Sequence, residues 1–121
     1  MQRLALAAAL ALAAGAAASE DAARGEKLYP RCAACHALQY DRVGPRHCGL
    51  LGRRAGSIPG FDYSPAMKRS KLIWTKENLS RFLADPVGVV PGTTMTYAGV
   101  DDAKERADLI AYLGTAKCAG R

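Results

Sequence analysis

This sequence of 121 residues has few of the features that indicate a membrane-spanning protein, a nucleic-acid-binding protein or a β-rich fold. The longest apolar run, residues 4–14, is shorter than the roughly 20 residues that a membrane-spanning helix needs. Lysine and arginine never occur in runs longer than two, and no segment alternates well enough to predict a β-strand. Aromatic residues make up only 7% of the chain, and a chain this small has a marginal core, which a large apolar group at its centre would complete.

The first 19 residues have the form of a secretory signal peptide. One positive charge precedes the apolar run 4–14, and small residues follow it. We expect cleavage after Ala18 or Ser19, with a retained interfacial anchor as the alternative. The mature chain, residues 20–121, is then a single domain of about 100 residues.

The mature chain is basic, because without Arg3 it has 16 basic residues against 11 acidic ones, a formal charge of +5. Such a protein is steered towards negatively charged surfaces. Since the chain is exported and has no long basic runs, acidic proteins or anionic lipids are the expected partners, and nucleic acid is not.

Glycine, proline and capping residues divide the mature chain into short helices and long loops. Loops longer than about 12 residues in a compact domain usually carry function, so we expect these to wrap a bound group. The predicted helices cover residues 20–35 (shortened or bent by Pro30 near Tyr29), 64–70, 75–85 and 102–116, and the predicted loops cover 37–61 and 87–100.

The segment Cys32-Ala33-Ala34-Cys35-His36 has the pattern that attaches a haem covalently. The thiols of Cys32 and Cys35 can each add to one haem vinyl group, and His36 then presents an imidazole to the iron. This motif predicts one haem c in an exported protein.

The ligand on the opposite face of the iron decides the chemistry. A second strong protein ligand makes an electron carrier, whereas an open position makes a gas binder or a peroxidase. Met95 lies in a loop rich in proline and glycine that can place its sulfur against the haem. Core packing is the alternative role for Met95, and Met67 is its competitor as a ligand.

The ordered motifs of residues 24–117 resemble those of the class I c-type cytochromes, the family of mitochondrial cytochrome c and its bacterial relatives. Several independent motifs in one order are far more specific than the haem-attachment pattern alone. The matching pieces are Gly25 with Tyr29, CAACH, Gly44-Pro45, Gly49-Leu50-x-Gly52-Arg53, Pro59-Gly60-Phe61-x-Tyr63-Ser64, Trp74, Pro91-Gly92-Thr93-x-Met95 and Asp108-Leu109-Ile110-Ala111-Tyr112-Leu113.

The resemblance implies an all-α class I cytochrome c fold, in which short helices and long loops surround one covalent haem. By similarity, Cys32 and Cys35 form the thioethers, and His36 and Met95 are the axial ligands of the iron. The carbonyl of Pro45 is expected to accept a hydrogen bond from the outer ring nitrogen of His36, which fixes the imidazole and makes it a better donor.

Five further residues match positions around the haem in the family. Arg53, Tyr63 and Trp74 correspond to residues that bond a buried haem propionate, because a buried carboxylate must be paired. Thr93 and Phe82 correspond to residues that shape the methionine side. The alternatives are plain core aromatics at positions 63 and 74, and a surface charge at position 53.

The sequence also departs from the mitochondrial members. Met67 stands where they commonly have a polar Asn, which predicts a drier pocket. His47 stands where they have an apolar residue, and we expect a surface imidazole there rather than an iron ligand. Lysines that surround the haem edge in those members are replaced here by Val87, Thr94, Asp101 and Asp102.

Two cysteines, Cys48 and Cys118, lie outside the haem motif. Leftover thiols in an oxidising compartment tend to pair. In the family fold the two regions are neighbours, so the resemblance implies a Cys48–Cys118 disulfide; two free thiols are the alternative.

Together these features predict a soluble, monomeric electron carrier in the periplasm, and not an enzyme. The resemblance implies transient redox partners such as a quinol–cytochrome c reductase, a terminal oxidase, a periplasmic dehydrogenase or a photosynthetic reaction centre. The alternatives are a haem peroxidase or ligand-binding sensor with a labile Met95, and a subunit permanently docked to a larger enzyme.

Overall fold

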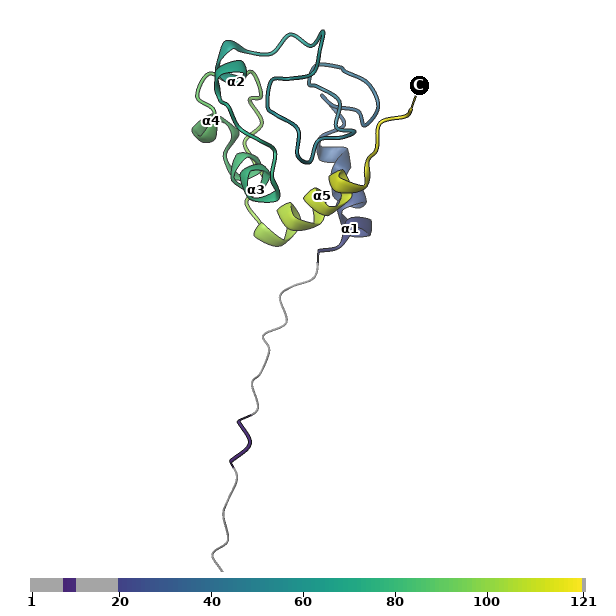
Figure 1. Cartoon of the computed structure of the whole chain (residues 1–121), viewed down its shortest axis with the longest axis vertical. Helices are drawn as coiled ribbons and strands as arrows, with labels where there is room; N and C mark the ends of the chain where they lie inside the picture. Colours follow the sequence, from purple (N-terminus) through teal and green to yellow (C-terminus); the bar gives the residue numbers. More distant parts are fainter. Residues whose placement is uncertain (1–7, 11–19, 121) are drawn as a thin grey trace, which may run out of the picture.

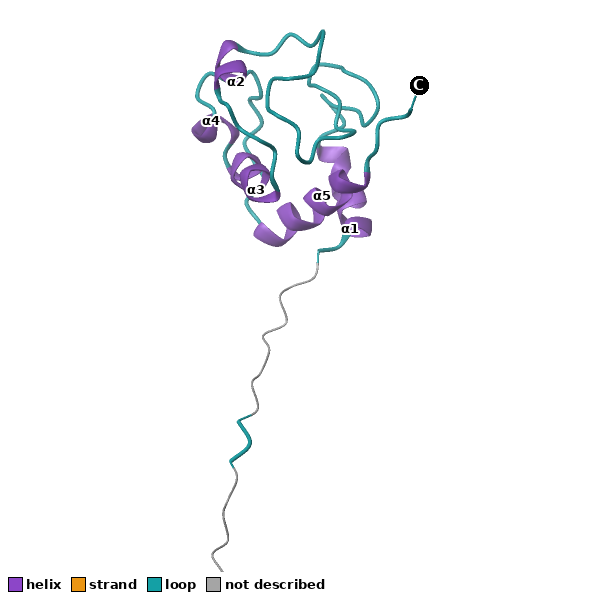
Figure 2. Cartoon of the chain, viewed as in Figure 1, coloured by secondary structure: helices purple, strands orange, loops and turns teal. Residues whose placement is uncertain are grey.

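The computed structural model describes residues 8–10 and 20–120, so the predicted signal peptide lies outside the described residues except for 8–10. Helices and long loops make up the described part, in which the only β-pairing is an isolated bridge between Arg54 and Ile73 (Figures 1 and 2). None of the helices described is both long and apolar enough to cross a bilayer. The helices are α1 (Ala22–Leu28), the 3-10 helix η1 (Tyr29–Arg31), α2 (Pro65–Arg69), α3 (Lys76–Ala84), α4 (Pro86–Val89) and α5 (Ala103–Thr115).

Side-chain caps start the helices where the sequence predicts them. Ser64, Thr75 and Asp102 accept hydrogen bonds from backbone N–H groups three residues ahead, which satisfies donors that have no partner inside the helix. The first helix ends at Leu28 because Pro30 forces the tighter turn η1, as expected.

One prediction of this kind was wrong. The segment after Asp85 is not entirely loop, because residues 86–89 form the short helix α4. Asp85 ends α3 and also caps α4 by accepting a hydrogen bond from Gly88 N at 3.0 Å. Pro86 stands at the first helical position, where its missing N–H costs nothing.

The first and last helices cross closely, at the lower edge of the folded part in Figure 1. Gly25 makes this possible, because a Cβ there would collide with the carbonyl oxygen of Asp108 on α5. One turn later, Tyr29 and Tyr112 meet edge to face with their ring centroids 5.4 Å apart. Gly25 and Tyr29 thus both lie where the first helical segment crosses α5.

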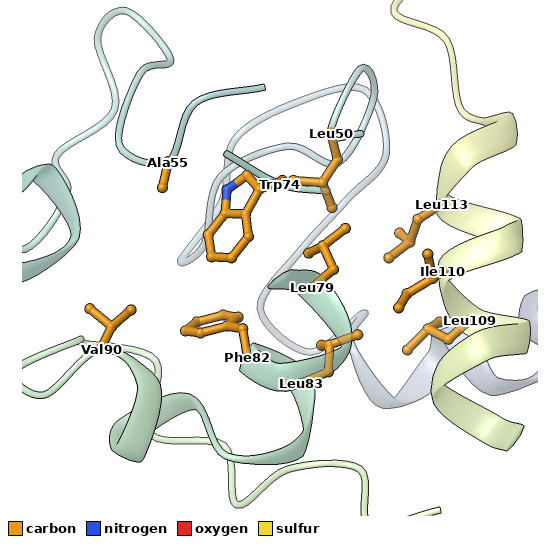
Figure 3. Packing of buried hydrophobic residues seen from close by; sticks show 10 residues of the cluster. All are labelled: Leu50, Ala55, Trp74, Leu79, Phe82, Leu83, Val90, Leu109, Ile110 and Leu113. Atoms are coloured by element: carbon orange, nitrogen blue, oxygen red, sulfur yellow. The ribbon is translucent and has the colours of Figure 1, made fainter. Parts of the chain in front are cut away.

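The core lies between α3, α5 and the chain around Trp74 (Figure 3). Leu109 and Leu113 of α5 face Leu83 and its neighbours on α3. The buried members of this cluster are Leu50, Ala55, Trp74, Leu79, Phe82, Leu83, Val90, Leu109, Ile110 and Leu113.

Candidate functional site

A cavity of about 450 Å³ opens between the loops and the core. Its volume falls in the range of about 300–1,000 Å³ that is usual for cofactor sites. All ten residues that the sequence associates with the haem line it, together with Met67 and His47. The ten are Cys32, Cys35, His36, Pro45, Arg53, Tyr63, Trp74, Phe82, Thr93 and Met95.

The haem-attachment motif forms a helical turn at one wall of this cavity. His36 N donates to the carbonyl of Cys32 at 2.9 Å, and Cys35 N donates to the same carbonyl at 3.1 Å. The thiols of Cys32 and Cys35 are both free, with Cys32 half-buried and Cys35 exposed. Burial raises the pKa of the Cys32 thiol.

The imidazole of His36 is fixed by the chain that follows it. Its Nδ1–H donates to the carbonyl of Pro45 at 2.8 Å, so the second ring nitrogen, Nε2, keeps a lone pair that can bind a metal. Gly44 packs directly on the ring, because a Cβ there would collide with it. Burial lowers the pKa of His36, which keeps the ring neutral, the form that binds metals.

His47 is buried, and the surface imidazole predicted for this position is wrong. Only 9% of it is exposed, and its ring stacks on that of His36 with centroids 4.1 Å apart and planes 21° apart. Its Nδ1 lies 3.0 Å from the hydroxyl of Tyr29. Burial lowers the pKa of His47 to about 3, and the same effect raises the pKa of Tyr29 to about 12.

Both His47 and Gly44 contact His36 and were missed as site residues. The signal for His47 was its position, which is apolar in the family that the sequence resembles and is therefore expected to be buried. A side chain at a buried position stays buried when it is polar, provided that it finds a hydrogen-bond partner, and Tyr29 provides one here.

The methionine side of the cavity is mostly apolar. Met95 is half-buried and packs against the core, with Met67 and Phe82 on the same lining. The hydroxyl of Thr93 accepts a hydrogen bond from Met95 N at 3.2 Å. Thr93 thereby holds the backbone of Met95.

The three residues associated with a propionate also line the cavity, with different partners. The guanidinium of Arg53 donates to the carbonyls of Cys48 at 3.1 Å and Arg46 at 3.0 Å, and burial lowers its pKa. The hydroxyl of Tyr63 accepts from Ile58 N at 3.1 Å. Trp74 is buried against Phe82, with ring centroids 5.0 Å apart.

A disulfide joins Cys48 to Cys118, with an S–S distance of 2.17 Å. It fixes the segment after α5 to the loop that contains His47. Hydrogen bonds strengthen the connection, since Gly49 N donates to the carbonyl of Ala116 at 2.9 Å and the Gln39 amide donates to Lys117 O at 2.8 Å.

The donor set of this cavity suits a haem. One imidazole nitrogen and one thioether sulfur are the ligands of low-spin cytochrome iron, and two free thiols lie on the same lining. The remaining lining is mainly aliphatic and aromatic, which suits a porphyrin ring. A large apolar group here would also complete the sparse core.

Comparison with known proteins gives a consistent result. The family model for cytochrome c matches residues 22–117. Cytochrome c2 of Blastochloris viridis is 43% identical over 107 residues, which are 86% of this chain and 84% of that protein. Cytochrome c2 of Rhodomicrobium vannielii is 42% identical over 111 residues, 89% of each chain. The solved structure of cytochrome cH from Methylobacterium extorquens is 45% identical and superposes with a TM-score of 0.77, over 78% of this chain and 98% of that one.

The fold and the cavity therefore define a class I c-type cytochrome, and the chain belongs to the cytochrome c family. As a member of that family it carries one covalently bound haem c with iron, and its relatives are electron carriers. The predicted family, fold class and cofactor are confirmed.

Proposed function

We propose that this protein is a periplasmic electron carrier in which Cys32 and Cys35 hold the haem and His36 and Met95 bind its iron. The observation that carries the proposal is that all four side chains line one cavity, although Met95 is far from the other three in the sequence. When bound, the haem supplies a one-electron couple at its iron.

The side chains around the haem would keep the geometry of the iron ligands nearly unchanged while an electron is transferred. The bond from His36 to Pro45 fixes the imidazole and makes it a stronger donor. The apolar side chains of Met67 and Phe82 exclude water from the methionine side. Arg53 and Tyr63, which line the cavity, would supply a guanidinium and a hydroxyl that can donate hydrogen bonds to a haem propionate.

The proposed location rests on two features. Residues 1–19 have the pattern of a cleaved signal peptide. The Cys48–Cys118 disulfide is of a kind that persists in oxidising compartments such as the periplasm.

The proposed partners are redox proteins of the bacterial envelope: a quinol–cytochrome c reductase, a terminal oxidase, a periplasmic dehydrogenase or a reaction centre. They would dock where the cavity opens, beside Val43 and Tyr97, which are 78% and 38% exposed. Arg31 is also on this lining, and Glu105 pairs with it at 2.7 Å. The contact is therefore expected to be small, mostly apolar and short-lived, as is usual for electron-transfer encounters.

The test is the absorption spectrum of the oxidised, haem-loaded protein. We expect a weak far-red sulfur-to-iron band that disappears in Met95→Ala. Met67→Leu is the matched control, because Met67 is the other methionine on the lining, and it should keep the band.

Two results would overturn the proposal. A purified protein without covalently bound haem would remove the cofactor assignment. A high-spin parent protein whose reduced form binds carbon monoxide readily would instead favour a ligand-binding or peroxidase function with a labile Met95.

A further inference from the structure

The ring of His47 lies between the proposed iron ligand His36 and the crossing of α1 with α5. On one face it stacks on His36, with centroids 4.1 Å apart. Towards the helices it meets Tyr29 edge to face, with centroids 5.7 Å apart and planes 73° apart. Tyr29 in turn packs on Tyr112 of α5. A continuous row of rings thus connects the helix crossing to the ligand.

The contacts of His36 restrict different movements of its imidazole ring. The hydrogen bond to Pro45 holds one ring nitrogen but leaves the ring free to tilt about that bond. Gly44 lies over the ring face at Cε1 and contacts the ring through its backbone only. The stacked ring of His47 is the side chain that opposes a change in the ring plane, since any tilt would separate two nearly parallel rings.

A stacked ring fixes its neighbour only if it is itself held. His47 is buried, and its Nδ1 is in hydrogen-bond distance of the Tyr29 hydroxyl at 3.0 Å. The backbone on both sides is also fixed, because His47 N donates to Ala37 O at 3.1 Å and Cys48 N donates to Leu38 O at 2.7 Å. An aliphatic side chain at position 47 would fill the space without a directional bond.

We propose that Tyr29 and His47 act as a pair of positioning residues that sets the plane of the His36 imidazole relative to the haem. The inference rests on the proposed function, since it takes His36 as an iron ligand. Neither residue binds the iron; both act through His36.

The readout is a property of the oxidised iron that depends on the ligand plane. The orientation of the axial imidazole determines how unpaired spin is distributed over the porphyrin. A change in the plane therefore shifts the haem methyl resonances in proton NMR and the g-values in electron paramagnetic resonance. A change in protein stability alone leaves both unchanged.

The experiment compares three variants of the haem-loaded protein with the parent. His47→Leu removes the stacked ring, and Tyr29→Phe removes only the hydroxyl that holds it. Tyr112→Phe is the control, because it alters a hydroxyl on the same row of rings beyond Tyr29. We expect altered methyl shifts and g-values in the first two, larger for His47→Leu, and the parental pattern in the control.

The outcomes separate this inference from the proposed function. If the parent itself lacks the low-spin signals of an imidazole–thioether centre, the proposed function fails, whatever the variants do. If the parent has them and Tyr29→Phe matches the parent in both spectra, the positioning pair is refuted. Tyr29→Phe keeps the test valid even if His47→Leu fails to fold.

Discussion

The two sides of the cavity are built in different ways. On the His36 side, the ligand candidate is bonded to Pro45, stacked on His47 and backed by the disulfide at Cys48. On the opposite side, Met95 sits in a largely exposed segment whose hydrogen bond to Thr93 is 3.2 Å long. Polar contacts dominate the first side and apolar packing dominates the second.

This difference indicates which of the two proposed ligands, His36 or Met95, leaves the iron first when the protein opens locally. Regions with few buried contacts and exposed backbone open at lower free energy than regions tied into the core. The methionine side should therefore open locally while the histidine side stays closed until the whole protein unfolds.

Removing the disulfide should have the largest effect on global stability. The bridge joins residues 70 positions apart, and closing a loop of that length contributes about 4 kcal/mol in the chain-entropy model. The double variant Cys48→Ala with Cys118→Ala should unfold at lower denaturant concentration, measured by circular dichroism. The far-red band of the folded protein should stay, because the bridge lies on the histidine side. An unchanged midpoint would contradict the prediction.

The buried carboxylate of Asp108, where α1 crosses α5, should determine part of the stability that the protein loses at acidic pH. Asp108 is fully buried at the helix crossing, where a hydrogen bond from Lys104 holds its pKa below the usual value. Asp21 N and Arg24 act in the same direction, whereas burial opposes them. A depressed folded-state pKa contributes stability above the unfolded value of about 4, which is lost as the pH falls through the folded-state pKa.

The variant Asp108→Asn should therefore be less stable than the parent at pH 7 and should lose less stability on acidification. Urea unfolding between pH 7 and pH 2 measures both effects. Asp62→Asn is the matched control, since this carboxylate is exposed, and it should follow the parental curve. Parallel pH curves for the parent and Asp108→Asn would show that Asp108 does not contribute.

The smallest expected effect concerns the methionine loop. Thr93→Val keeps the shape of the side chain but removes the acceptor for Met95 N, a hydrogen bond worth about 1 kcal/mol. Added imidazole should then displace Met95 from the ferric iron with an affinity about fivefold higher. The exposed neighbour Thr94 gives the control Thr94→Val, which should leave this affinity unchanged.

The sequence predicts the helices well because the signal that begins each one, a capping side chain, lies within a few residues of the helix itself. Ser64, Thr75 and Asp102 precede helical spacing and act as caps in the structure. The short helix α4 was not predicted, because Asp85-Pro86 is equally suited to end one helix and to begin the next. Local signals cannot decide between these two outcomes.

The ten candidate haem residues were predicted from motifs that occur in the order typical of the family, and all ten line one cavity. The environment of His47 could not be obtained in this way. Its stacking on His36 depends on how the loop folds back, and its burial depends on a tyrosine from η1. Contacts between loop residues of this kind have no sequence period that would reveal them.

The four cysteines set opposite requirements on the biogenesis of this protein. Cys48 and Cys118 must give up two hydrogens and two electrons to an oxidant as their disulfide forms, whereas Cys32 and Cys35 must stay reduced until the porphyrin arrives. Four cysteines can pair in three ways, and none of the three complete pairings leaves a thiol for a vinyl group. Maturation must therefore oxidise one pair of cysteines while the other pair stays reduced.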